Sequence, residues 1–203
     1  MSRRATLRAA VGPFGRARRG SEVPVVLCID VEPDPRQVDR REARPWLGFE
    51  RLLELLPALR RRLSDATGAP AAFTWFLRMD PQVAETWDSA AWVAEAHGDA
   101  LAELAADGDE LGLHTHLWRW QREKWISDHA DPTWAEHCVT TGLDAFELAF
   151  DRACGVHRGG DHFLSGQILS CLEDRGVKID LTVEAGEPPE APSEEHDYEP
   201  GPD

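Results

Sequence analysis

Two apolar segments of the chain each end in side chains that carry chemistry. They cover residues 25–32 (VVLCIDVE) and 111–116 (LGLHTH). The polar residues are Asp30 and Glu32 in the first segment and His114 and His116 in the second. Buried parallel strands read as continuous apolar runs, and α/β proteins place active sites at the carboxyl ends of such strands. Because alternate side chains of a strand share a face, two carboxylates and two imidazoles are predicted to meet at one rim.

Strand and helix patterns alternate along the rest of the chain. We expect strands over residues 23–30, 71–77, 110–114, 156–158 and 177–182. We expect helices over residues 48–64, 87–94, 99–106, 132–153 and 165–174, with a long loop between the histidines and residue 132. The first helix is indicated by apolar residues at helical spacing, from Phe49 to Leu59. A repeated βα order predicts an α/β fold with a parallel sheet or barrel.

Composition divides the chain into three parts. With 203 residues, 42% of them hydrophobic, the chain can bury one substantial core, and we predict one folded domain over residues 21–183. Residues 1–20 contain arginines and no acidic residue, so we expect a disordered basic leader, with a targeting or anionic-partner arm as the alternative. Residues 184–203 are rich in Pro, Glu and Asp and are expected to form a disordered acidic tail.

Net charge and cysteine usage exclude several classes of protein. The formal charge is -15, whereas a nucleic-acid or anionic membrane surface is met by clustered Lys and Arg, so we expect neither partner. No apolar run is long enough to span a bilayer. The cysteines are scattered and form no Cys-x-x-Cys pair; they are Cys28, Cys138, Cys154 and Cys171. Zinc-ribbon and thioredoxin-like sites are therefore excluded, and a cytoplasmic location is expected.

The motifs at the strand ends resemble those of the polysaccharide deacetylase (NodB-homology) family. The similar segments are Cys28-Ile29-Asp30-Val31-Glu32, residues 108–116 (GDELGLHTH), His157-Arg158-Gly159-Gly160 and residues 169–180. The resemblance implies a distorted (β/α)7 barrel of parallel strands and metal-dependent hydrolysis of a C–N bond, usually that of an N-acetyl group on a sugar. The family's later motifs, one of which supplies a catalytic His, are not found here. We therefore expect an incomplete barrel whose open edge invites pairing with another chain, as in a homo-oligomer.

The chain departs from the family pattern at two ligand positions. The family's first motif has two adjacent Asp residues, a general base followed by a metal ligand. Asp30 matches the base, and Val31 stands in place of the ligand. We expect Glu32 to supply the missing carboxylate. In the second motif Trp118 occupies the position of the second His, and His116 is the nearest substitute.

These residues together predict a metal centre. Glu32, His114 and His116 would leave positions open on a divalent ion, which we expect to be Zn²⁺. Such an ion lowers the pKa of water to about 7 and so supplies a nucleophile. Asp30 is the predicted catalytic base, and the resemblance implies that Arg158 holds or tunes it. The structural alternatives are hydrogen-bonded histidines at a strand end, a glutamate in a solvated turn and an arginine that caps a helix.

Five further residues are predicted to bind substrate: Arg78, Asp80, Trp118, Trp120 and Asp161. Arg78 and Asp80 end the second strand at the same predicted rim, and a surface ion pair is an equally weighted alternative. Tryptophan rings on the loop after the histidines suit the C–H faces of sugars, and roofing the barrel is their structural alternative. Asp161 is also an alternative partner for Arg158. The remaining histidines are expected on the surface; they are His97, His129, His137, His162 and His196.

Two functions from different classes fit these motifs. The first is a metal-dependent hydrolase that deacetylates an N-acetylated carbohydrate or cleaves a small amide. The second is a truncated or degenerate relative that binds a sugar or another partner without turnover, because Val31, Trp118 and the missing strands each remove something that the chemistry uses. A third and weaker alternative is a metal-free relative whose histidines bind substrate directly.

Overall fold

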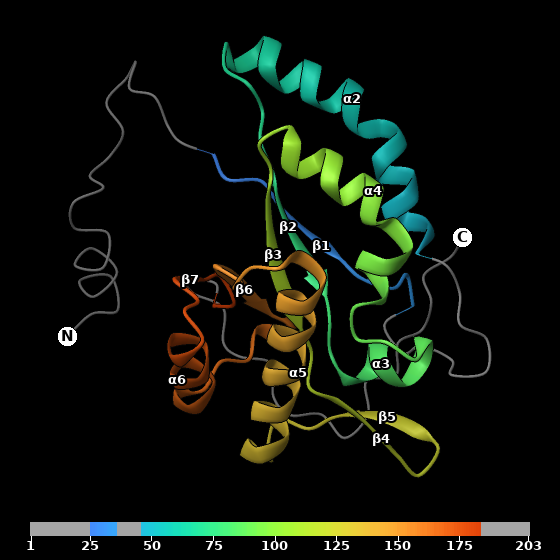
Figure 1. Ribbon diagram of the computed structural model, residues 1–203, viewed down its shortest axis with the longest axis vertical. Coiled ribbons are helices and arrows are strands. Elements are labelled where there is room, and N and C mark those ends of the chain that lie inside the picture. The colour runs from blue at the N-terminus through green and yellow to red at the C-terminus, as the bar shows by residue number, and fades with distance from the viewer. Residues whose placement is uncertain (1–24, 36–45, 184–203) are drawn as a thin grey trace, which may run out of the picture.

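The computed structural model describes residues 25–35 and 46–183, and a five-stranded parallel sheet forms its centre (Figure 1). The strands follow one another across the sheet in the order β1 (Cys28–Val31), β2 (Thr74–Arg78), β3 (Glu110–Thr115), β6 (Val156–Gly159) and β7 (Ile179–Asp180). Every neighbouring pair in this sheet is parallel. The predicted α/β fold with parallel strands is therefore confirmed, and each predicted strand overlaps an observed one.

The sheet is open rather than closed into a barrel. β1 and β7 lie at its two edges, and among the described residues neither edge is covered by a further strand. Large apolar side chains are exposed next to both edges: Val25 and Val26 precede β1, and Ile179, Leu181 and Val183 lie in or after β7. An incomplete barrel, as expected from the sequence, describes this arrangement.

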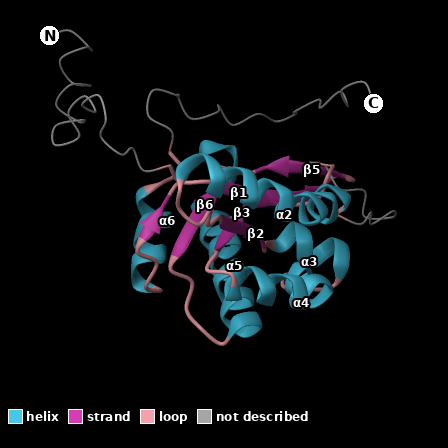
Figure 2. Cartoon of the chain, turned by 90° about the horizontal axis from the view of Figure 1, so that it is seen from above, coloured by secondary structure: helices cyan, strands magenta, loops and turns pink. Residues whose placement is uncertain are grey.

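Helices connect the strands and surround them (Figure 2). They are α2 (Leu47–Thr67), α3 (Pro81–Trp87), α4 (Trp92–Ala106), α5 (Pro132–Phe150) and α6 (Gly166–Asp174), with a short 3₁₀ helix η1 (Gly160–His162). Parallel neighbours require such crossover connections because a tight turn cannot join them. Of the predicted helices over 87–94 and 99–106, the first starts in the wrong place, because residue 87 ends α3 and α4 begins at residue 92. Asp88 separates α3 from α4 with a positive φ of 62°. The predicted break between the two predicted helices corresponds to a kink in α4 at His97, whose φ and ψ of -125° and 23° are not helical.

Aspartate side chains cap the N-termini of two helices, α3 and α5. Asp80 accepts hydrogen bonds from two backbone N–H groups at the start of α3, and Pro81 takes the first helical position. Asp131 and Pro132 repeat this arrangement at the start of α5. Asp caps satisfy backbone donors that a helix leaves unpaired, and Pro has no N–H to lose there. These caps fix where the helices leave the strand ends.

A β-hairpin occupies the segment that we predicted to be a long loop. β4 (Trp118–Gln121) pairs antiparallel with β5 (Lys124–Ser127). The two residues between the strands, Arg122 and Glu123, have φ values of 49° and 64°. Positive φ at both positions defines the type I′ hairpin turn, for which Asn-Gly is the usual sequence signal. Arg-Glu gives no such signal, which is why the hairpin was missed.

Close packing of α5 on the sheet places the helix against the ends of two strands. Gly142 lies at the crossing point, where a Cβ would approach the Thr115 Cγ2 to 2.9 Å and the Leu113 Cδ1 to 3.0 Å. Trp75, Leu113 and Phe146 are fully buried in the same core. The helix backbone thus supports β3 directly beneath its histidines.

The opposite end of the sheet is held by a buried carboxylate. Asp109, just before β3, accepts hydrogen bonds from the Phe73 backbone N–H over 2.8 Å, from the Trp75 indole N–H over 2.7 Å and from the Arg60 guanidinium. Burial raises the pKa of Asp109, but the hydrogen bonds from Arg60 and Trp75 outweigh it and hold that pKa below its ordinary value. This network joins α2, β2 and β3 away from the functional residues.

Some expectations concern segments outside the described residues. The predicted leader (1–20), the predicted tail (184–203) and His196 belong to them. Within residues 25–35 and 46–183, no helix combines the length and apolar character needed to cross a bilayer.

Candidate metal centre

The residues predicted to converge do meet at the carboxyl ends of the strands. His114 lies opposite Arg78 on β2 and opposite Arg158 on β6, and Asp30 and Glu32 stand at the end of β1. A cavity of about 260 Å³ opens here. It is lined by Asp30, Glu32, Pro33, Asp34, His114, His116, Arg158, Gly159, Gly160, Asp161 and His162. Strand alternation thus brings two carboxylates and two imidazoles into one cavity.

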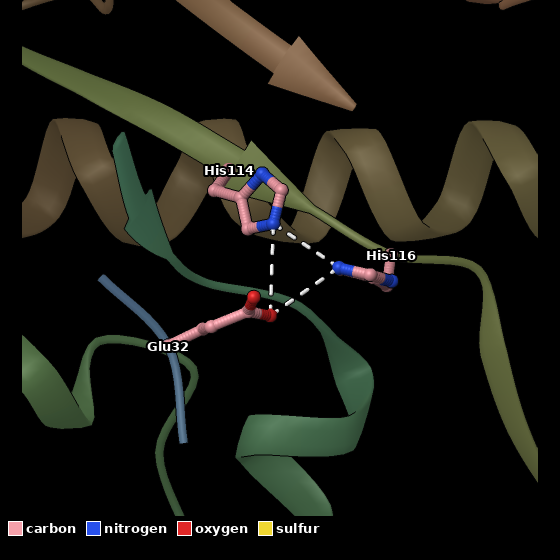
Figure 3. Close-up of side chains that lie close together, drawn as sticks. All are labelled: Glu32, His114 and His116. Atoms are coloured by element: carbon pink, nitrogen blue, oxygen red, sulfur yellow. Dashed lines mark hydrogen bonds and ion pairs between the residues drawn. The ribbon is translucent and has the colours of Figure 1, made fainter. Parts of the chain in front are cut away.

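Three of these side chains form a compact triangle of ligand atoms (Figure 3). The Nε2 atoms of His114 and His116 are 3.1 Å apart. Glu32 Oε2 lies 3.7 Å from the first and 3.4 Å from the second. Ligands at about 2.0–2.2 Å from a tetrahedral Zn²⁺ are separated by roughly 3.3–3.6 Å. The triangle therefore has the size of one face of a zinc coordination sphere and leaves the remaining position open.

Each histidine directs its other ring nitrogen toward a hydrogen-bond acceptor. His114 Nδ1 donates to the carbonyl oxygen of Arg158 over 2.8 Å, and His116 Nδ1 lies 3.3 Å from Asp161 Oδ2. A metal-binding His usually donates its second N–H to a carbonyl or carboxylate, which fixes the ring and leaves the other nitrogen free to bind. Both rings have this environment.

Arg78 holds the carboxylate of the triangle. Its guanidinium donates to Glu32 Oε2 over 3.0 Å, to Gln82 Oε1 over 2.6 Å and to Asp80. Arg78 is 1% exposed and Asp80 is fully buried. A surface ion pair is therefore wrong for these two residues, and their side chains face Glu32 and α3 instead of the cavity. Sequence patterns gave no sign of this burial because a charged residue at a strand end usually faces solvent.

The charges of the triangle follow from these contacts. Burial raises the pKa of Glu32, but hydrogen bonds to His114 and His116, together with Arg78, hold that pKa far below the ordinary value of a glutamate. Burial and Arg78 lower the pKa of His116, but Asp161 and Glu32 outweigh them and raise it. The site therefore presents an ionised carboxylate beside two histidine rings, and the same carboxylates make His116 hold a proton more strongly than an ordinary histidine.

A glycine makes room for one of the imidazoles. A Cβ at Gly160 would overlap Cε1, Nε2 and Cδ2 of the His116 ring. The next two residues, Asp161 and His162, have positive φ values of 55° and 52°. Such backbone is costly for residues other than glycine and persists where the surroundings impose it, often at functional sites. The segment after β6 is thus shaped around His116.

The predicted catalytic pair lies in the same cavity. Arg158 Nε is 3.7 Å from Asp30 Oδ2, and both side chains are partly exposed. This separation fits an ion pair that orients the Asp30 carboxylate. Asp30 therefore faces the cavity with a cation beside it, as the resemblance implies.

The tryptophans lie away from the cavity wall. Trp118 is 2% exposed, its indole N–H points at His116 Nδ1 over 3.1 Å, and its ring stacks on that imidazole. A buried ring offers no face to a sugar. Trp120 is partly buried and packs edge-on against Trp125, with ring centroids 5.1 Å apart.

One histidine that we expected on the surface belongs to the site's support. His129 is 9% exposed, and its Nε2 lies 2.8 Å from Ser127 Oγ, which donates to Asp161. The sequence could have indicated this role only if the hairpin had been predicted, because β5 ends at Ser127 and so places Ser127 and His129 next to the site. Of the others, His137 is exposed, whereas His97 and His162 are partly buried.

Known proteins resemble this chain weakly. Neither the protein-family models nor the curated proteins gave a match. Among solved structures, a family 4 carbohydrate esterase from Streptomyces lividans has a TM-score of 0.46 and 13% identity, covering 76% of this chain and 60% of its own. The peptidoglycan deacetylase PdaC from Bacillus subtilis has a TM-score of 0.43 and 13% identity, covering 77% and 56%.

A further solved structure, a CE4 family pseudoenzyme from Bacillus anthracis, has a TM-score of 0.46 and 11% identity, covering 77% of this chain and 42% of its own. The chain thus spans 42% to 60% of the lengths of these three proteins.

Proposed function

We propose that this chain is a metal-dependent hydrolase of C–N (amide) bonds, a divergent member of the polysaccharide deacetylase family that deacetylates an N-acetylated carbohydrate. The observation that carries the proposal is the triangle of Glu32 Oε2, His114 Nε2 and His116 Nε2, with separations of 3.1, 3.4 and 3.7 Å. An ionised carboxylate within 3.4–3.7 Å of both rings supplies the third donor that a metal site uses.

The donor set fits a divalent ion, and we propose Zn²⁺. Two imidazole nitrogens and one carboxylate oxygen are ligands that zinc takes in catalytic sites, and three protein ligands leave a position open. When bound, the ion supplies Lewis acidity and an activated nucleophile. Arg78 keeps Glu32 aimed at the two imidazoles through its 3.0 Å hydrogen bond.

Asp30 and Arg158 provide the acid–base chemistry of the proposal. Asp30 opens onto the cavity and is placed to accept a proton from the attacking group. The Arg158 guanidinium, 3.7 Å away, pairs with Asp30 and orients its carboxylate for this role. The backbone carbonyl of Arg158 meanwhile orients His114, so one residue serves both the base and a ligand.

The charge of the cavity supports an uncharged substrate. Asp30, Glu32, Asp34 and Asp161 line it, and Arg158 is the cation among the lining residues. An anionic sugar would be repelled by this excess of carboxylates. A neutral amide, such as an N-acetyl group on a neutral carbohydrate or a small amide, meets no such cost.

A non-catalytic relative that binds a sugar or partner is the second candidate. Val31, in place of the family's second acid, is buried and contributes no ligand. This missing ligand favours binding without turnover.

One experiment separates the two candidates. Zinc content and the release of acetate from N-acetylated oligosaccharides are measured for wild type, Asp30→Asn and the surface control Asp144→Asn. The hydrolase predicts that Asp30→Asn keeps its zinc and loses about 10²–10⁴-fold in rate, whereas the control is unchanged. Zinc binding without hydrolysis by wild type would support the second candidate and reject the first.

Three broader expectations remain proposals. We propose a domain over residues 21–183, a cytoplasmic location, which the four free cysteines support, and a homo-oligomer formed through the sheet edges. The exposed apolar residues beside β1 and β7, which include Val25 (75% exposed) and Val183 (64%), support the last. Light scattering coupled to size exclusion tests it, because a monomeric mass across the accessible concentration range would reject the oligomer.

A further inference from the structure

His116 Nδ1 has two neighbours with opposite requirements. Trp118 Nε1 lies 3.1 Å away, and an indole nitrogen can only donate. Asp161 Oδ2 lies 3.3 Å away, and a carboxylate can only accept. One ring nitrogen holds either a proton or a lone pair, so it satisfies one neighbour at a time. The tautomer of His116 is decided by this competition.

The tautomer of His116 determines whether its Nε2, the atom that belongs to the triangle, carries a proton or a lone pair. If Nδ1 accepts from Trp118, the proton of the neutral ring sits on Nε2 and points at His114 Nε2, 3.1 Å away. If Nδ1 donates to Asp161, Nε2 carries a lone pair toward the centre of the triangle. The second arrangement is the one that binds a cation.

Asp161 is held in place by the end of the hairpin. Ser127 Oγ donates to Asp161 Oδ2 over 3.3 Å, so the hydroxyl is left to accept from His129 Nε2 at 2.8 Å. The His129 ring stacks on Phe163, with centroids 4.5 Å apart and planes within 6°. In this series of hydrogen bonds His129 donates to Ser127 and Ser127 donates to Asp161. The Asp161 side chain is 3% exposed.

We propose that Asp161, held by Ser127 and His129, is a positioning residue that selects the Nδ1–H tautomer of His116 and thereby makes Nε2 a metal ligand, in competition with the Trp118 indole. This inference rests on the proposed metal-dependent function. It assigns Asp161 to the support of a ligand instead of the binding of substrate. The hairpin is then part of the metal centre.

Two substitutions move the competition in opposite directions. Asp161→Asn supplies an amide N–H that can donate to Nδ1, so the ring is expected to shift to the Nε2–H tautomer. Trp118→Phe removes the competing donor and keeps an aromatic ring against the imidazole. Ser127→Ala frees the Asp161 carboxylate and should act like a weaker Asp161→Asn. Asp34→Asn is the control, because it removes a charge from the same cavity, whereas the Asp34 carboxylate accepts hydrogen bonds from the backbone N–H groups of Leu47 and Gly48 at the start of α2.

The primary readout is the tautomer, measured by long-range ¹H–¹⁵N correlation spectra of histidine-labelled protein without metal and with zinc, at a pH where the ring is neutral. Relative to wild type, the Nδ1–H fraction of His116 should fall in Asp161→Asn and rise in Trp118→Phe. The second readout is the zinc dissociation constant from competition with a chelating dye. It should rise about 10–100-fold in Asp161→Asn and stay at or below the wild-type value in Trp118→Phe.

The two proposals fail separately. If wild type binds zinc and Asp161→Asn binds it equally well with an unchanged tautomer, the positioning role is overturned and the metal centre stands. If wild type binds no zinc but both variants shift the tautomer in the directions given, the positioning of His116 is supported and the metal-dependent function is rejected. An Asp161→Asn effect no larger than that of Asp34→Asn would show a general charge effect and overturn the inference.

Discussion

The carboxylate of Asp80 accepts a hydrogen bond from the backbone N–H of His116 over 3.0 Å. The same side chain caps α3 through Oδ1 and pairs with the buried guanidinium of Arg78 through Oδ2. One residue after β2 therefore fixes the backbone of His116, a proposed ligand just after the next strand, and the arginine that orients Glu32. The proposed metal centre thus depends on a side chain that is not itself a proposed ligand.

Asp80→Ala is expected to destabilise the fold strongly. It leaves Arg78 buried without its closest counter-charge, which typically costs about 3–5 kcal/mol in the free energy of unfolding. Asp131→Ala is the matched control, since Asp131 also caps a helix but pairs with the partly exposed Arg119, and it should cost about 1 kcal/mol. Urea denaturation followed by circular dichroism measures both. Equal losses in the two variants would contradict the role of the buried pair.

Gly160→Ala is expected to displace His116. The added Cβ meets the imidazole ring, so the ring must leave the position that it shares with Glu32 and His114. We predict that zinc affinity falls by about 10–100-fold. Gly166→Ala is the control, because a Cβ there meets nothing within 4 Å and its φ is not in the positive region. Isothermal titration with zinc tests the difference, and equal affinities would mean that His116 is not a ligand.

Arg158→Gln separates the two roles of that residue. The substitution removes the guanidinium beside Asp30 and keeps the backbone carbonyl that accepts from His114. Zinc binding should therefore stay near the wild-type value while hydrolysis falls by about tenfold or more, because Asp30 loses the guanidinium that orients it in the cavity. Arg175→Gln, which removes a surface pair with Asp144, serves as control. Parallel loss of zinc and activity would contradict this division.

The lowered pKa of Asp109 predicts how the free energy of unfolding depends on pH. This pKa is lowered by folding, so Asp109 stabilises the native state above its unfolded pKa of about 3.9, and this contribution is lost as pH falls through the lower native value. Asp109→Asn should cost about 1–3 kcal/mol at neutral pH and make the acid-induced loss less steep. Asp107→Asn, at an exposed carboxylate near the same arginine, should do neither. Unfolding curves between neutral and acidic pH decide this prediction.

Local patterns predicted the convergence at the strand ends but little of what supports it. Asp30, Glu32, His114 and His116 could be placed because strand periodicity is a property of neighbouring residues. The bond from Asp161 to His116 joins residues 45 positions apart, and that from Arg78 to Glu32 joins residues 46 apart. No local pattern encodes such pairs. Trp118 was read as a sugar platform for the same reason, since its burial depends on how the hairpin packs.

Glu32, His114 and His116 are the proposed ligands of one metal ion, on which the proposed function depends. Elemental mass spectrometry on protein purified without chelator and then saturated with zinc and desalted measures this directly. We predict about one zinc ion per chain in wild type and its loss in the double variant His114→Ala with His116→Ala. An absence of zinc from wild type, or a zinc content that survives the double substitution, would contradict the account.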